Sequence, residues 1–115
     1  MRGLGRQLVV ELWGCSGATD DAEKIRRALL RAVERAGATV VEVYVHPFKP
    51  HGVSGMAMLA ESHISVHTWP ETGYVALDVF TCGETVVPEG AVEELCDLFR
   101  PQHTSVVEIT RGIQR

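Results

Sequence analysis

The residues of this chain whose types and spacing best suit chemistry lie in one short segment. Residues 60–71 read Ala-Glu-Ser-His-Ile-Ser-Val-His-Thr-Trp-Pro-Glu. At the Glu61-Ser62 junction, the serine hydroxyl could attack the Glu61 carbonyl if a turn holds the groups close and a neighbour takes the proton. The peptide bond would become an ester, and loss of the Ser62 α-proton would expel it and cut the chain. Because Glu-Ser pairs are common, this hypothesis depends on the surrounding residues.

Two histidines follow the junction at a spacing that indicates a strand. In an extended segment over residues 63–69, His63 and His67 project to the same side, together with Ser65 and Trp69. The two histidines would lie about 13 Å apart, which is too far for both to bind one metal ion. A solvated strand face is the simplest interpretation of such a pair, and we expect no metal here.

The flanking residues predict strands and two helices. Asp20 stands three residues before Glu23, the spacing of a capping box, and an apolar helical stripe follows until Gly37. A second stripe begins near Pro88 and ends at Phe99. Alternating or β-branched patterns predict strands over residues 6–13, 39–45, 54–60, 63–69, 74–82 and 104–110.

This order, β-α-β-β-β-β-α-β, predicts a single α+β domain over residues 1–115. We expect a two-layer sandwich, in which an antiparallel sheet carries two helices on one face. The strand over residues 74–82 has apolar residues on both faces, so the second face of the sheet also needs cover. A second copy packed sheet to sheet, as an αββα homodimer, is the simplest cover.

Composition narrows the class of partner. The chain has 115 residues, of which 45% are hydrophobic and 23% charged, with a net charge of −4. The absence of a Lys/Arg run disfavours nucleic acid, and the negative balance suits a cationic substrate. Because no apolar stretch reaches the length of a membrane span and no signal peptide is evident, we expect a cytoplasmic protein. Cys15, Cys82 and Cys96 are too widely spaced to favour a disulfide framework or a zinc site.

Nearly the whole chain resembles the proenzymes of the short prokaryotic S-adenosylmethionine decarboxylases. The matching motifs are Leu-Gly-Arg at 4–6, Glu-Leu-Trp-Gly-Cys at 11–15, Pro-His-Gly-Val-Ser-Gly at 50–55, the segment 60–71 and residues 74–83. The resemblance implies self-cleavage into fragments 1–61 and 62–115, with Ser62 converted into a pyruvoyl cofactor. That group would capture the substrate amine as a Schiff base and accept electrons as carbon dioxide leaves.

The resemblance also implies roles for individual residues. Ser62 is the processed residue, His67 accepts a proton during processing, and Ser54 assists processing. Cys82 donates a proton in the decarboxylation, as a thiol of suitable pKa can. From its local sequence alone, Ser54 would be interpreted as a turn serine and Cys82 equally well as a small residue at a strand end.

Substrate recognition is implied for three residues. Phe48 would stack on the adenine, with His67 on its other face, and Glu71 would accept hydrogen bonds from the ribose hydroxyls. A loop aromatic that closes the core and a surface turn carboxylate are the alternatives for Phe48 and Glu71. The resemblance also implies that the position of His51 varies among relatives.

Three functions remain open on the sequence. The first is decarboxylation of S-adenosylmethionine, which supplies the aminopropyl donor for spermidine synthesis. The second keeps the pyruvoyl chemistry but acts on arginine or ornithine. The third is a small binding or regulatory module in which the Glu61-Ser62 bond is inert, since a fold alone does not define a function.

Overall fold

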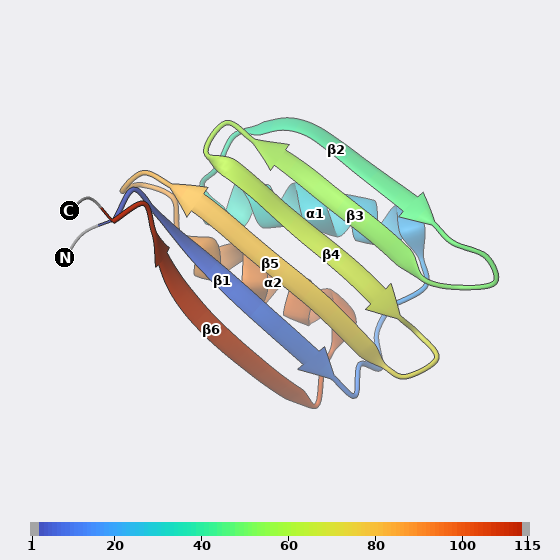
Figure 1. Ribbon diagram of the computed structural model, residues 1–115. Helices are drawn as coiled ribbons and strands as arrows, with labels where there is room; N and C mark the ends of the chain where they lie inside the picture. The colour runs from blue at the N-terminus through green and yellow to red at the C-terminus, as the bar shows by residue number, and fades with distance from the viewer. Residues whose placement is uncertain (1–2, 114–115) are drawn as a thin grey trace.

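The computed structural model of this chain describes residues 3–113 as an antiparallel sheet with two helices on one face (Figure 1). The strands are β1 (Gly5–Trp13), β2 (Val40–Pro47), β3 (Val53–Leu59), β4 (Ser62–Trp69), β5 (Tyr74–Cys82) and β6 (His103–Arg111). The helices are α1 (Ala22–Ala36) and α2 (Pro88–Phe99). The predicted α+β architecture and element order are confirmed, and β4 begins one residue earlier than predicted, at Ser62 itself.

The sheet has the order β2-β3-β4-β5-β1-β6. Strands β2 to β5 form successive hairpins, and the first strand of the chain then lies between β5 and β6. Figure 1 shows both helices behind this sheet. The core between the two layers contains large, fully buried side chains: Leu12, Ile25, Leu29, Ile64, Leu95 and Phe99.

Helix α1 begins one residue later than the capping-box prediction. The N-cap is Asp21, whose carboxylate accepts a hydrogen bond from the Lys24 amide at 3.0 Å. The predicted cap, Asp20, is wrong, because its carboxylate instead accepts the Gly52 amide at 2.8 Å and so fixes the β2–β3 loop. Gly37 ends the helix with a φ of +73°, as predicted, in a conformation that glycine adopts without steric cost.

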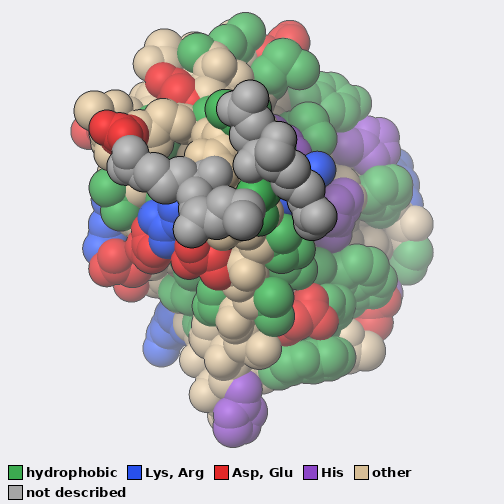
Figure 2. Space-filling view, turned by 60° about the vertical axis from the view of Figure 1, so that its left-hand side comes forward, with side chains coloured by type: hydrophobic (Ala, Val, Ile, Leu, Met, Phe, Trp, Pro, Cys, Tyr) green, Lys and Arg blue, Asp and Glu red, His purple; other side chains and the backbone are tan. Residues whose placement is uncertain are grey.

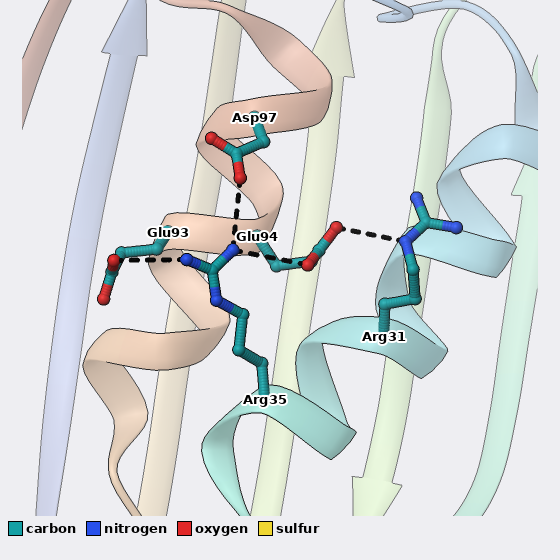
Figure 3. A network of polar contacts seen from close by, with 5 residues as sticks. All are labelled: Arg31, Arg35, Glu93, Glu94 and Asp97. Carbon is teal, nitrogen blue, oxygen red and sulfur yellow. Dashed lines mark hydrogen bonds and ion pairs between the residues drawn. The ribbon is translucent and has the colours of Figure 1, made fainter.

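An ion-pair network joins the outer faces of the two helices (Figure 3). Arg35 of α1 contacts Glu93, Glu94 and Asp97 of α2, and Arg31 contacts Glu94. Because most of these side chains are well exposed, we expect the network to orient the helices more than to stabilise them.

Strand β2 differs from its predicted pattern. Its pairing with β3 shifts between Val40 and Glu42, which marks a β-bulge or similar irregularity. Val43 and Val45 pack against the core, whereas Val41 is 63% exposed. The regular alternation predicted for residues 39–45 is therefore wrong at its start, because an irregular pairing breaks the two-residue period.

The face of the sheet that carries no helix is called here the open face. It presents every second residue from Gln7 to Trp13, from Ser54 to Met58, from His63 to Trp69 and from Tyr74 to Cys82. Several of its apolar side chains are exposed, including Met56, Met58 and Trp69. In Figure 2, hydrophobic and histidine side chains gather towards the right of the view, and most charged side chains lie towards the left.

Among the described residues, no helix is long and apolar enough to cross a membrane.

Candidate active site

The Glu61-Ser62 junction lies at a tight hairpin that is held from outside. Leu59 and Ser62 are paired across the β3–β4 ladder, so that only Ala60 and Glu61 form the turn. The Glu61 carboxylate accepts the Thr39 amide at 3.0 Å, and the Ala60 amide donates to the Thr39 carbonyl at 2.9 Å. These contacts fix the residues on the N-terminal side of the junction.

The backbone of Ser62 is strained. Its φ is +145°, a region that L-residues other than glycine rarely adopt. Such a conformation costs on the order of 1–3 kcal/mol and persists only where the surroundings impose it. Strain is therefore located at the bond for which the sequence predicts cleavage.

The backbone of Cys82 contacts the carbonyl of the same bond. Its amide donates to the Glu61 carbonyl oxygen at 2.9 Å. The register brings these groups together, because Ser62 is paired with Thr81, the residue before Cys82. An N–H aimed at this oxygen stabilises the negative charge that develops there during nucleophilic attack. Glu61, Ser62 and Cys82 thus form one cluster.

Ser54 and His67 form a second cluster on the open face. They are paired across the β3–β4 ladder, and the Ser54 hydroxyl lies 2.8 Å from His67 Nδ1. On the neighbouring strand, His46 is paired with Ser54, and its ring meets Phe48 edge-on at 4.7 Å. His67, Ser54 and His46 thus follow one another across β4, β3 and β2, and the exposed Phe48 lies just after the end of β2.

Glu71 lies at the same end of the sheet as this second cluster. It belongs to the β4–β5 turn, and its carboxylate lies 3.1 Å from His51 Nε2 in the β2–β3 loop. The two loops are therefore joined by His51 and by Glu71, the residue predicted to bind ribose.

The two clusters are separated within the chain. Ser62 and His67 are five positions apart on one strand, and at about 3.3 Å per residue their Cα atoms lie about 16 Å apart. A proton cannot pass directly over that distance. The structure therefore brings Ser62 together with Cys82, and Ser54 together with His67, but does not bring the two pairs together.

Asp78 organises a third group of polar residues that the sequence analysis missed. Its carboxylate accepts hydrogen bonds from Gln7 Nε2 at 3.0 Å, from His63 Nε2 at 2.9 Å and from the Ser65 hydroxyl. Burial raises the pKa of Asp78, but the hydrogen bonds from Ser65, His63 and Gln7 together lower it below its ordinary value. The available signal was a single acidic residue in the otherwise apolar strand over residues 74–82.

Aromatic side chains line the open face beside the second cluster. Tyr74 stacks on Trp13 at 4.3 Å and on Trp69 at 5.2 Å between ring centroids. Its hydroxyl donates to Glu11 at 2.5 Å. Burial, followed by this hydrogen bond, raises the pKa of Tyr74 to about 12. The hydroxyl therefore stays protonated at neutral pH.

A hollow of about 840 Å³ borders the first cluster, because its lining includes Thr81, which is paired with Ser62, and Gly83, which follows Cys82. Arg6 donates hydrogen bonds to Glu108 and to Glu89, and these contacts raise the pKa of Arg6 above its ordinary value. Residues 3–113 contain no group of three or more His, Cys, Asp or Glu side chains placed to hold a metal ion.

Comparison with solved structures first identifies the class of protein. The chain matches a structure described as the adenosylmethionine decarboxylase from Aquifex aeolicus, with a TM-score of 0.92 and 34% sequence identity. The match covers 100% of this chain and 96% of the other. The family model for S-adenosylmethionine decarboxylase matches residues 6–112, and the chain belongs to this family.

Relatives in sequence support the same assignment. A protein from Methanococcus vannielii is 50% identical over 98% of this chain and 93% of its own length. One from Thermomicrobium roseum is 48% identical over 98% of this chain and 97% of its own length. Both are named S-adenosylmethionine decarboxylase proenzyme.

Proposed function

We propose that this chain is a self-processing, pyruvoyl-dependent decarboxylase of S-adenosylmethionine, which makes the aminopropyl donor for spermidine synthesis. Membership of the family supports the substrate. The observation that carries the proposed processing is the Cys82 amide bonded to the Glu61 carbonyl, directly before a strained Ser62. The relatives named above do not favour the alternative substrates arginine and ornithine.

Processing begins with the chain's own residues. Ser62 Oγ adds to the Glu61 carbonyl carbon, and the carbonyl oxygen takes the negative charge beside the Cys82 amide. The C–N bond breaks, the Ser62 nitrogen takes a proton, and an ester remains. Rotation about the freed Ser62 nitrogen also relieves the backbone strain of the junction.

The ester is then lost by elimination. A base removes the Ser62 α-proton, and the main-chain carboxylate of Glu61 leaves from the Ser62 β-carbon. The resulting dehydroalanine residue takes up one water and releases ammonia, which leaves a pyruvoyl group at position 62. The products are the proposed fragments 1–61 and 62–115. His67 is the proposed base, with Ser54 at 2.8 Å as its hydrogen-bond partner.

The pyruvoyl group would stand at position 62, which the register places opposite Thr81 and next to Cys82. When formed, the pyruvoyl group supplies an electron-accepting carbonyl for decarboxylation. Cys82 is the proposed proton donor to the substrate α-carbon, and the register keeps it beside residue 62. Phe48 and Glu71 are the proposed contacts of adenine and ribose.

The separation of the two clusters supports a shared site in a homodimer. The open face exposes apolar side chains that a second sheet would cover. A two-fold axis between two such sheets, running across the strands, places opposite ends of β4 against each other. Ser54 and His67 of one copy would then lie against the end of the other sheet at which Ser62 and Cys82 are placed. We therefore propose the sheet-to-sheet αββα dimer as the active unit.

The test measures cleavage and decarboxylation on the same preparation. Mass spectrometry should find two fragments that copurify, and labelled carbon dioxide should be released from S-adenosylmethionine. Ser62→Ala should leave one 12.6 kDa chain without activity. Full activity in an uncleaved preparation would exclude the proposed function.

A further inference from the structure

His63 follows the proposed cleavage site and has no part in the chemistry proposed above. Its Nε2 lies 2.9 Å from Asp78 Oδ2 on the neighbouring strand. Its ring also meets the ring of Phe80 edge-on, with centroids 5.9 Å apart. The side chain is about one third exposed. A solvated histidine on a strand would not need these two contacts, so the ring is held in one orientation.

The carboxylate that holds His63 is itself fixed on the sheet. Gln7 and Ser65 donate to Asp78, and Arg111 Nη1 donates to Gln7 Oε1 at 2.6 Å. The arginine also lies over the Phe80 ring, 5.1 Å from its centroid. The contacts of His63 thus extend over four adjacent strands, β4, β5, β1 and β6.

Cleavage changes what restrains residue 62. In the intact chain, Thr39 and Cys82 hold Glu61, and Glu61 in turn holds Ser62 through the peptide bond. Once that bond is cut, residue 62 is a chain end, joined covalently to the rest of its fragment only through His63. The restraint that keeps it opposite Thr81 must then come from the C-terminal fragment.

We propose that His63, oriented by Asp78, is a positioning residue that keeps the cleaved residue 62 in place beside Cys82. The proposal rests on the processing proposed above and adds a requirement that arises only after the cut. Loss of the His63–Asp78 contact should have little effect on cleavage, because the intact junction is held from both sides. It should loosen the new chain end, and the proton donor would then meet the reacting carbon less often.

The test compares His63→Leu and Asp78→Asn, which remove the contact, with His63→Gln, whose amide can still donate to Asp78. Hydrogen exchange of the amides of residues 63–66, followed by mass spectrometry, reports on the chain end without reference to activity. Each variant is measured in the cleaved form and again in an uncleaved Ser62→Ala background. Cleavage, KM and kcat are measured on the same preparations.

We expect exchange about 10-fold faster in cleaved His63→Leu and Asp78→Asn, and a clearly smaller acceleration in their uncleaved counterparts. Their kcat should fall about 10-fold with KM within twofold of wild type, and His63→Gln should recover most of both losses. Asp97→Asn is the matched control, since it removes a carboxylate contact to Arg35 on the helical layer (Figure 3). It should change none of these quantities.

Two outcomes would overturn the proposed role of His63 without affecting the proposed processing. One is wild-type exchange and kcat in cleaved Asp78→Asn, and the other is equal acceleration in cleaved and uncleaved forms, which indicates a general role in stability. If His63→Leu does not fold, the comparison of Asp78→Asn with His63→Gln still decides. A wild-type chain that remains intact would overturn the proposed processing as well, and the mass spectrum shows which proposal has failed.

Discussion

The amide nitrogen of Cys82 lies 2.9 Å from the carbonyl oxygen of Glu61. One residue thereby offers two different groups to two different reactions. Its backbone N–H can stabilise the oxyanion of processing, and its thiol can donate a proton in decarboxylation. Because only the thiol belongs to the side chain, substitution separates the two roles.

Cys82→Ala should therefore cleave at close to the wild-type rate and decarboxylate about 10²- to 10⁴-fold more slowly, the usual cost of losing a positioned acid. Single-turnover measurements of carbon dioxide release on fully cleaved protein test this. Unaltered turnover would move the proton-donor role to another group.

His67→Ala should cleave slowly or not at all, because it removes the proposed base. Ser54→Ala should have a smaller effect in the same direction, since it removes only the hydrogen-bond partner of the base. The time course of the intact 12.6 kDa chain after synthesis measures both effects. Processing at the wild-type rate in His67→Ala would exclude this residue as the base.

The shared site predicts rescue between inactive copies. In a mixed dimer of Ser62→Ala and His67→Ala, the first copy offers an intact His67 to the intact Ser62 of the second. Coexpression of the two variants, distinguished by a mass tag, should therefore restore cleavage in the His67→Ala chain only. Expressed alone, Ser62→Ala should not cleave, and His67→Ala should cleave slowly or not at all. The absence of rescue in a dimer shown to be mixed would place the whole site within one chain.

Glu71→Ala should raise KM for S-adenosylmethionine while cleavage proceeds normally, because lost hydrogen bonds to the ribose weaken binding by about 1–3 kcal/mol. His51→Ala should act in the same direction but less strongly, since His51 lies 3.1 Å from the Glu71 carboxylate. Assays with arginine and ornithine complete the test. A preference for either amino acid would overturn the proposed substrate.

Asp78 predicts a loss of stability in acid. Its pKa is lowered in the folded chain from an ordinary value of 3.8. A carboxyl of this kind stabilises the fold above its unfolded pKa, and the contribution disappears as the pH falls through the folded pKa. In the uncleaved Ser62→Ala background, Asp78→Asn should therefore lose stability at pH 7 and much less at pH 3. Urea unfolding at both pH values measures the difference.

Much of the fold could be predicted because its signals are local. Alternation predicted the strands, and Gly37 and Pro88 predicted a helix end and a helix start at which the structure places them. The choice of Asp20 over Asp21 as the cap was wrong because both carboxylates precede the helix and only the position of the β2–β3 loop distinguishes them.

The arrangement of the candidate site was only partly predictable. The distance argument that excluded a metal between His63 and His67 also separates Ser62 from His67, since both pairs lie along one strand. Asp78 was missed because its three hydrogen-bond donors come from two other strands, one of them distant in the sequence. The contact of Cys82 with Glu61 required the register of β4 against β5.

The position of β1 affects how the cleaved protein would unfold and refold. This strand belongs to the proposed fragment 1–61, yet it lies between β5 and β6, which both belong to the proposed fragment 62–115. Before the cut, unfolding is an event within one molecule; after it, complete unfolding releases two. Recovery then depends on concentration, and the separated pieces must insert one strand between two others. After self-cleavage, complete unfolding in dilute solution would therefore be effectively irreversible.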